Sequence, residues 1–141
     1  MPTRKAKASW EGGLKGGIGK FEGEKGLSGN FNFSSRFENG QGSNPEELLA
    51  AAHSACYSMA LAAGLEKAGT PATKVETNAE CTVELVGGGF QITTMKLIVR
   101  AQVAKIDDAT FQKVAIETKA GCPVSKALAG IPNIILDAKL S

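Results

Sequence analysis

The sequence predicts an α+β fold, and three observations predict it. A long helix with hardly any charge lies near the middle of the chain, over 43–65. Two long segments that alternate apolar and polar residues follow it, between 75 and 103. Short apolar stretches separated by glycines precede the helix, and shorter helical and extended segments end the chain. The expected order of elements is β-β-β-α-β-β-α-α-β.

Length and charge indicate one small domain. The 141 residues contain no linker, repeat or low-complexity segment, so we expect a single domain over 1–141. The net charge of +2 comes from mixed charges without a basic stripe, which argues against a nucleic-acid partner. No charged and then apolar leader begins the chain, and we therefore expect a cytoplasmic protein.

The first third of the chain is rich in glycine and lysine. Isolated apolar residues between the glycines favour three short strands, at about 4–11, 16–23 and 30–34. A polar loop over 35–43 follows and carries Arg36. This loop leads the chain to the central helix.

The central helix has a well-marked start. Asn44 can cap it, Pro45 suits the first helical position, and Glu46 and Glu47 place negative charge where the helix dipole favours it. Over 48–65 the residues are almost all apolar or small, so we expect the helix to be buried on every face. A membrane span is the alternative interpretation of this length, but the alanine-rich composition and acidic flank argue against it.

The alternating segments predict a hairpin. One strand runs over 75–85, three glycines at 87–89 supply the turn, and a second strand runs over 90–103. After the hairpin, Asp107 or Asp108 can cap a helix over 109–120. Cys122 precedes Pro123 and suits the N-cap of a short helix that ends at 128, and 131–140 is the last expected strand.

The three cysteines differ in their settings. Cys81 lies on the apolar face of an alternating strand, which indicates a packing role. His53 and Cys56 are neighbours on one helix, which suits a Cys–His pair or half a metal site, although a packed histidine is the simpler interpretation. No second pair of ligands supports a metal site, and the wide cysteine spacing excludes paired C-x-x-C zinc ligands.

Cys122 and Cys56 differ in expected reactivity. A cysteine at a helix N-terminus is favoured as thiolate, whereas the apolar middle of a helix raises the pKa of Cys56 unless a cation lies beside it. Arg36 is the best candidate cation, because acidic residues near it can orient its guanidinium.

Helix geometry points to a second chain. Glu46 and Cys56 are ten residues apart, about 15 Å along one helix, so Arg36 at the helix start cannot easily reach its own Cys56. Two antiparallel copies of the helix would bring Arg36 and Glu46 of one chain to Cys56 of the other. We therefore expect an intimate homodimer with sites at its interface.

Two segments carry a family resemblance, SSRFENGQGSNPEELLAAAHSACYSMAL and KAGCPVSKAL. They resemble the signature segments of the OsmC/Ohr family of hydroperoxide reductases. The OsmC branch is the closer one, because the arginine stands in an SRFE segment just before the helix. The similarity covers the whole chain, and each of the two motifs holds one cysteine.

The resemblance implies an OsmC-like fold, in which small antiparallel sheets wrap the buried central helices of an intertwined homodimer. It implies a two-cysteine peroxidase without metal or cofactor. Cys56 matches the family's peroxidatic cysteine and Cys122 its resolving cysteine, while Arg36 and Glu46 match its paired site residues.

The implied reaction reduces organic hydroperoxides, and hydrogen peroxide more weakly, to alcohols in the oxidative or osmotic stress response. A sulfenic acid on Cys56 would condense with Cys122 to an intrachain disulfide, which an external dithiol of the dihydrolipoyl type would reduce. Two alternatives remain: a non-catalytic binding module with buried cysteines, and a Cys–His acyl-transfer enzyme. The latter would need an oxyanion site and an acid to orient His53, for which the sequence offers no evidence.

Overall fold

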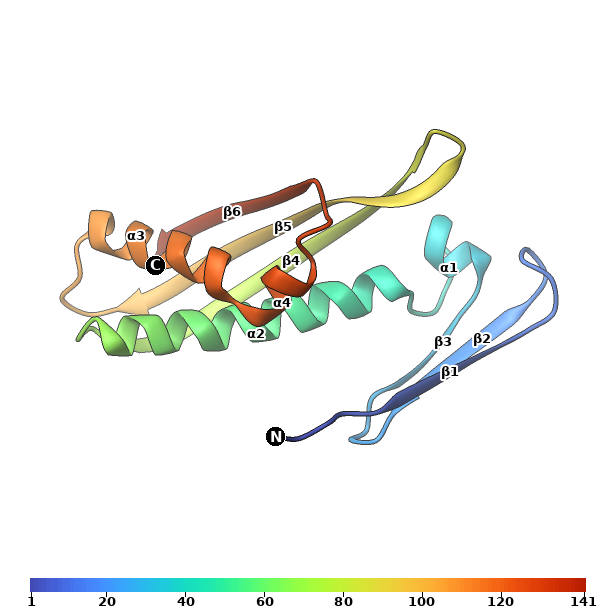
Figure 1. Ribbon diagram of the computed structural model, residues 1–141, viewed down its shortest axis with the longest axis horizontal. Coiled ribbons are helices and arrows are strands. Elements are labelled where there is room, and N and C mark those ends of the chain that lie inside the picture. Colours follow the sequence, from blue (N-terminus) through green and yellow to red (C-terminus); the bar gives the residue numbers. More distant parts are fainter. The chain divides into compact units, whose positions relative to one another are not determined.

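The computed structural model describes residues 1–141, and the chain divides into two compact units, Met1–Leu48 and Leu49–Ser141 (Figure 1). The first unit holds a small sheet, a short helix and the first turn of the central helix α2, Pro45–Lys67. The second holds the rest of α2, a second sheet and two further helices. The α+β class is confirmed, and the single domain stays a prediction.

The sheet of the first unit is antiparallel and has the order β1-β2-β3. Its strands are β1 (Ala6–Glu11), β2 (Ile18–Gly23) and β3 (Ser28–Phe31). Gly19 lies under the ring of Phe31 and Gly29 under the ring of Phe21, and a Cβ at either glycine would come within 2.5 Å of the ring it faces. These two glycines therefore let the aromatic rings lie flat across the strands.

A short helix, α1 (Phe33–Phe37), follows β3 and was not expected. The Asn32 side chain accepts a hydrogen bond from the Ser35 amide at 2.8 Å, and the Ser35 hydroxyl accepts one from the Asn32 amide at 2.9 Å. This capping box ends the third strand at Phe31, earlier than the predicted 34, and turns the start of the predicted polar loop into a helix.

The start of α2 agrees with the sequence pattern, since the Asn44 side chain accepts a hydrogen bond from the Glu47 amide at 2.7 Å. The expectation that the helix is buried on every face is wrong for one chain. A stripe at four-residue spacing is buried, namely His53, Tyr57, Leu61 and Leu65. The opposite stripe is exposed and consists of Ala51, Ala55, Met59 and Ala63. This stripe is exposed because the rest of the second unit covers only one face of the helix.

By length and composition α2 could also cross a membrane, which is weak evidence because the core helices of soluble proteins meet the same criterion. Its buried stripe packs into a core shared with the second sheet and with α3. This packing is what a core helix of a globular unit requires.

The second sheet has the order β4-β5-β6. Its strands are β4 (Ala72–Val86), β5 (Gly89–Val103) and β6 (Asn133–Leu140). The predicted hairpin is confirmed, but β6 runs parallel to β5, so this sheet is mixed rather than antiparallel. The reason is the helical crossover between β5 and β6, which returns the chain before the last strand begins.

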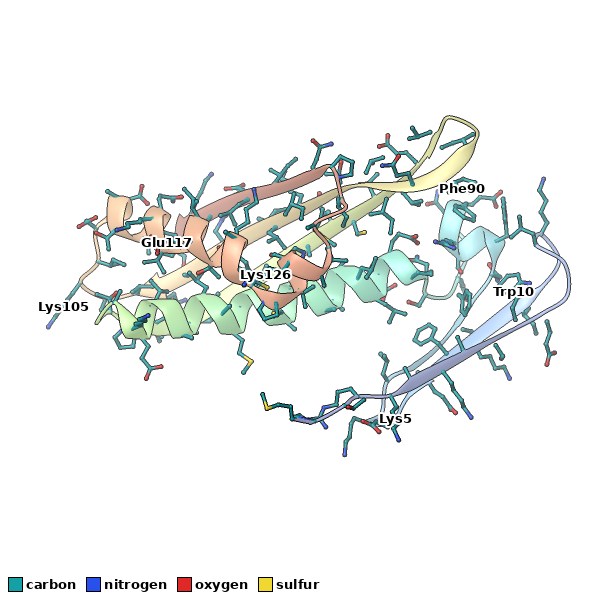
Figure 2. The ribbon with its side chains drawn as sticks, in the orientation of Figure 1. Lys5, Trp10, Phe90, Lys105, Glu117 and Lys126 are labelled. Carbon is teal, nitrogen blue, oxygen red and sulfur yellow. The ribbon has the colours of Figure 1, made fainter.

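The hairpin places its apolar face inward over most of its length. Met95, Leu97, Val99 and Ala101 are completely buried, whereas Leu85 at the tip is 67% exposed. Phe90, on the other side of the tip, is 54% exposed (Figure 2). On β4, half-buried and exposed residues alternate from Val75 to Glu84, so the predicted alternation is confirmed except at Leu85.

Two helices connect β5 to β6, namely α3 (Asp108–Gly121) and α4 (Pro123–Ala127). Asp107 caps α3 by accepting a hydrogen bond from the Thr110 amide at 2.7 Å. Cys122 ends α3 and is also the N-cap of α4. Figure 1 shows α2, α3 and α4 over one face of the second sheet, and their apolar side chains form one core with it.

Candidate active site

Two thiols 66 positions apart in sequence meet in the second unit. The Sγ atoms of Cys122 and Cys56 lie 3.1 Å apart, within hydrogen-bond distance, and form no disulfide. Cys56 projects from the middle of α2 and is half-buried, whereas Cys122 at the α3–α4 junction is 1% exposed. The two cysteines that the sequence analysis singled out are therefore in contact, with Cys56 the more accessible one.

The two thiols differ in acidity, in the directions that their helix positions predict. Burial raises the pKa of Cys56, and the adjacent Cys122 raises it further. Burial also acts to raise the pKa of Cys122, but hydrogen bonds from the Ser125 amide and hydroxyl, the Val124 amide and Cys56 lower it overall. A single chain therefore favours the thiolate on Cys122, and Cys56 lacks a stabilising cation in the second unit.

His53 is completely buried one helical turn before Cys56. Its Nε2 lies 2.7 Å from the hydroxyl oxygen of Ser125, and its Nδ1 has no hydrogen-bond partner. Burial lowers the pKa of His53, so the imidazole is neutral near pH 7. His53 is packed, as the simpler interpretation of the sequence had it, and its partner Ser125 lies on α4.

The Ser125 contact was missed by sequence reasoning. The only available signal was the position of Ser125, three residues after Cys122, which itself precedes Pro123. In a short helix capped by Cys122, a small polar residue at this position is near the N-cap. No carboxylate contacts His53, so the geometry lacks the orienting acid of a Cys–His acyl-transfer site.

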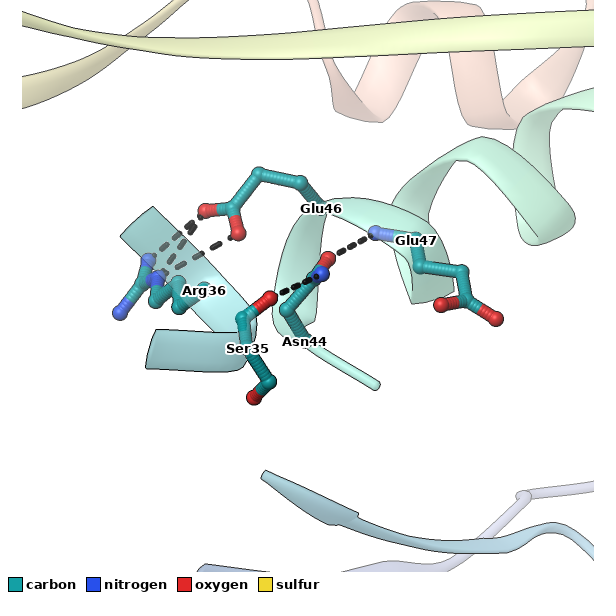
Figure 3. Close-up of polar contacts among 5 residues, drawn as sticks. All are labelled: Ser35, Arg36, Asn44, Glu46 and Glu47. Atoms are coloured by element: carbon teal, nitrogen blue, oxygen red, sulfur yellow. Dashed lines mark hydrogen bonds and ion pairs between the residues drawn. The ribbon is translucent and has the colours of Figure 1, made fainter. Parts of the chain in front are cut away.

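Arg36 and Glu46 form the second candidate pair, and both belong to the first unit (Figure 3). Arg36 Nη2 donates to Glu46 Oε1 at 2.9 Å, and Nε donates to the same oxygen at 3.2 Å and to Oε2 at 3.3 Å. Glu46 is 5% exposed, while about a third of the Arg36 side chain reaches solvent. The guanidinium is therefore held by a nearly buried carboxylate and keeps one edge open.

The backbone around this ion pair is fixed by the residues beside it. The side-chain nitrogen Nδ2 of Asn44 donates to the Ser35 carbonyl at 2.9 Å (Figure 3). The Ser35 hydroxyl donates to the Ser43 carbonyl at 2.8 Å. These bonds tie α1 to the start of α2. Arg36 and Glu46 are thus delivered by two helix ends rather than by a free loop.

An aromatic pocket lies beside Arg36 in the first unit. It has a volume of about 240 Å³, and its apolar lining consists of Trp10, Leu14, Phe31, Phe33 and Phe37. The Arg36 guanidinium stacks on the Phe37 ring at 5.1 Å. The sequence predicts an apolar setting at Cys56, and these aromatic residues were not among the predicted site residues. The pocket combines a cation with an apolar wall, which suits a small molecule with one polar end.

The other sequence candidates have simpler places. Cys81 is half-buried on the inner side of β4 and packs against the core. No group of three or more His, Cys, Asp or Glu side chains is arranged to hold a metal ion. Each unit thus carries its own candidate feature, a thiol pair in the second unit and an ion pair with an aromatic pocket in the first.

Comparisons with known proteins agree on one family. The family model described as OsmC-like protein matches residues 38–137. "Peroxiredoxin OsmC" of Escherichia coli is 42% identical over 139 residues, which cover 97% of this chain and 96% of the relative. The crystal structure of the organic hydroperoxide resistance protein OhrB of Bacillus subtilis superposes with a TM-score of 0.71 at 25% identity, over 97% of this chain and 98% of the other. A structure described as an organic hydroperoxide resistance protein OsmC from Legionella pneumophila shares the fold, with a TM-score of 0.70 at 22% identity, over 100% of this chain and 98% of the other.

Proposed function

The chain belongs to the OsmC-like protein family and is a cysteine-based peroxidase, and from this premise we propose that it reduces organic hydroperoxides through Cys56 and Cys122. The single observation that carries the proposal is the contact of the two thiols, with the sulfurs 3.1 Å apart. A sulfenic acid on one sulfur would meet its resolving thiol without rearrangement of the chain.

Cys56 is assigned the peroxidatic role. It is the more exposed of the two sulfurs, so a peroxide can reach it, whereas Cys122 is 1% exposed. Its thiolate attacks the distal peroxide oxygen, the O–O bond breaks, and an alkoxide leaves and takes up a proton to become the alcohol. The sulfur keeps the transferred oxygen as a sulfenic acid.

Cys56 needs a cation for this step, because burial raises its pKa within one chain. Arg36 is assigned that role, with Glu46 fixing the orientation of its guanidinium. We assign Arg36 and Glu46 of one chain to Cys56 of a partner chain in a homodimer. The exposed stripe of α2 supports this assignment, since an apolar helix face needs a cover that one chain does not supply.

The aromatic pocket supports an organic substrate. A hydroperoxide bound through its oxygens at Arg36 would place its hydrocarbon part against the five apolar side chains that line the pocket. Hydrogen peroxide has no such part and would gain only the polar contacts. We therefore expect organic hydroperoxides to be preferred, in a cytoplasmic role in the oxidative or osmotic stress response.

The cycle closes with an external reductant. Cys122 attacks the sulfenic sulfur, water is released, and an intrachain Cys56–Cys122 disulfide forms. A small dithiol of the dihydrolipoyl type would return this disulfide to two thiols by exchange.

Peroxide consumption with cumene hydroperoxide and dihydrolipoamide tests the proposal. Wild-type protein and Cys81→Ser are expected to consume peroxide at equal rates, and Cys56→Ser is expected to be inactive because the attacking sulfur is gone. An active Cys56→Ser variant would overturn the assignment of the peroxidatic thiol. Equal rates with cumene hydroperoxide and hydrogen peroxide would overturn the substrate preference.

A further inference from the structure

His53 is the only histidine in the chain and is completely buried in the second unit. Its Nε2 is 2.7 Å from the hydroxyl oxygen of Ser125, which is itself only 5% exposed. The proposed peroxide chemistry makes no use of this pair. Two buried polar side chains cost desolvation energy, and a non-catalytic packing role would be filled as well by apolar residues.

The hydrogen-bond pattern assigns the proton on the imidazole. A neutral imidazole carries one proton, and His53 Nδ1 has no partner in the core. A proton on Nδ1 would leave a buried N–H without an acceptor, which costs more than an unpartnered lone pair. The proton therefore belongs on Nε2, and His53 donates to the Ser125 oxygen.

This assignment orients the Ser125 hydroxyl. Because its oxygen accepts from His53, its hydrogen must be donated elsewhere. Cys122 is the N-cap of the short helix α4 and Ser125 is its third residue, so the two residues belong to the same helical turn. The hydroxyl and amide of Ser125 both act to lower the pKa of Cys122. Cys122 in turn contacts Cys56.

We propose that His53 and Ser125 are positioning residues that form a buried relay, His53 to Ser125 to Cys122, which holds Cys122 as the attacking thiolate of the disulfide-forming step. The inference rests on the proposed function. In this step the Cys122 sulfur forms a bond to the sulfenic sulfur of Cys56, and the S–O bond breaks. The hydroxide that leaves takes up the proton lost by the Cys122 thiol and becomes water, so no further reactant is needed. The relay serves this step and not the attack on peroxide, because it ends at Cys122.

The test separates the two steps in the full-length reduced protein. One equivalent of cumene hydroperoxide is added, and samples are quenched at short times with dimedone, which traps sulfenic acid. Peptide mass spectrometry then measures the trapped Cys56 and the Cys56–Cys122 linked peptide. In wild type the linked peptide is expected to replace the sulfenic acid quickly.

Ser125→Ala and His53→Leu are expected to oxidise Cys56 at the wild-type rate but to form the disulfide about tenfold or more slowly, so that trapped sulfenic acid accumulates. Ser125→Thr keeps the hydroxyl, and His53→Gln offers an amide N–H to it. Both are expected to restore rapid disulfide formation. Ser58→Ala is the matched control. It removes a half-buried hydroxyl from α2, the helix that carries His53, and this hydroxyl bonds to Thr77 and not to His53 or Cys122.

Wild-type disulfide rates in both Ser125→Ala and His53→Leu would overturn the relay. So would a His53→Gln variant no faster than His53→Leu, or a loss of both steps together, since a general structural defect slows both. If His53→Leu does not fold, Ser125→Ala with Ser125→Thr decides alone. Failure of wild type to form any linked peptide would instead refute the proposed function, an outcome distinct from these.

Discussion

The two units of the chain differ in how completely they bury their apolar residues. All the buried hydrophobic side chains of the core belong to the second unit, Leu49–Ser141. The first unit, Met1–Leu48, has an amphipathic sheet that buries none of its large apolar side chains. The exposed large hydrophobic residues of the first unit are Met1, Trp10, Leu14, Ile18 and Leu27. The second unit can form a core by itself, and the first cannot.

The register of the first sheet shows that its apolar residues are not scattered. Trp10 pairs with Gly19, Gly19 with Phe31, and Phe21 with Gly29, so the three aromatic side chains share one face of the sheet. The opposite face carries charges such as Lys7 and Glu22, which form an ion pair at 2.9 Å. A sheet with one apolar face requires a cover. The uncovered apolar face of the first sheet therefore favours the proposed homodimer, and this evidence is independent of the two cysteines.

The largest expected effect is the rescue of activity between two inactive chains. Arg36→Ala and Cys56→Ser homodimers are each expected to be inactive, whereas co-refolded mixtures are expected to regain activity at one of the two sites of each heterodimer. That site combines the intact Cys56 of one chain with the intact Arg36 of the other. Peroxide consumption by purified heterodimers, carrying two different affinity tags, measures it.

Inactive heterodimers would show that Arg36 serves the thiol of its own chain. In that arrangement each site of the heterodimer carries one defect, so no mixing ratio restores activity. The control is a mixture of Cys56→Ser chains with Cys122→Ser chains. Because Cys56 and Cys122 contact each other within one chain, every site in this mixture lacks one of the two thiols, and no rescue is expected in repeated turnover.

Side-chain truncation in the two units is expected to act on different equilibria. Phe111→Ala removes a completely buried ring of α3 and is expected to lower the free energy of unfolding by about 3–5 kcal/mol. Phe21→Ala acts on the sheet of the first unit and is expected to raise the dimer dissociation constant about tenfold, or ~1.4 kcal/mol. Urea unfolding and sedimentation equilibrium measure the two effects.

Lys20→Ala is the control for Phe21→Ala, since its side chain lies on the opposite face of β2. It is expected to leave dimer association unchanged. Equal association of wild type and Phe21→Ala would remove the first sheet from the proposed interface.

The buried histidine predicts a dependence of stability on pH. Burial lowers the pKa of His53 in the folded chain below its ordinary value of 6.5, so below pH 6.5 the unfolded chain binds a proton that the folded chain does not. The free energy of unfolding should therefore fall as the pH falls through this window, by at most about 1.4 kcal/mol per pH unit for one proton. Urea unfolding between pH 8 and pH 5.5 measures the slope, and His53→Gln is expected to flatten it. Parallel slopes for the two proteins would contradict the prediction.

The smallest expected effect compares the helix caps of the two units. Asp107→Ala removes the cap of α3 and is expected to cost about 1 kcal/mol of unfolding free energy, because the Thr110 amide loses its acceptor. Asn32→Ala removes the capping box of α1 and should have a similar cost. Under the proposed function only Asn32→Ala should also lower activity, since α1 carries Arg36. Equal activity of both variants would show that α1 does not position the guanidinium.

Local patterns predicted most of the fold. The caps at Asn44 and Asp107 and the alternation of the hairpin are properties of neighbouring residues, and the structure agrees with them. Helix α1 was missed because its capping box involves only Asn32 and Ser35, in a stretch whose polarity is equally typical of a loop. The parallel direction of β6 depends on the crossover through α3 and α4, which no short segment reveals.

In the candidate site, too, local contacts could be predicted from the sequence and long-range contacts could not. The Arg36–Glu46 pair joins residues ten positions apart, and the polar loop before a capped helix was enough to suggest it. The contact of His53 with Ser125 spans 72 positions and depends on where the α3–α4 junction packs against α2, so sequence reasoning could not find it. The meeting of Cys56 and Cys122 has a similar separation, and only the family resemblance made it predictable.

The long separation of the two sulfurs has a consequence for the lifetime of the protein in the cell. Closing a loop between positions 66 residues apart restricts the unfolded chain and is expected to stabilise the folded protein by about 4 kcal/mol. A molecule that has just consumed peroxide would then unfold more rarely than a reduced one, and proteases that attack the unfolded chain would spare it. Oxidant itself would therefore slow the turnover of the protein during stress, and arrival of the reductant would return it to ordinary degradation.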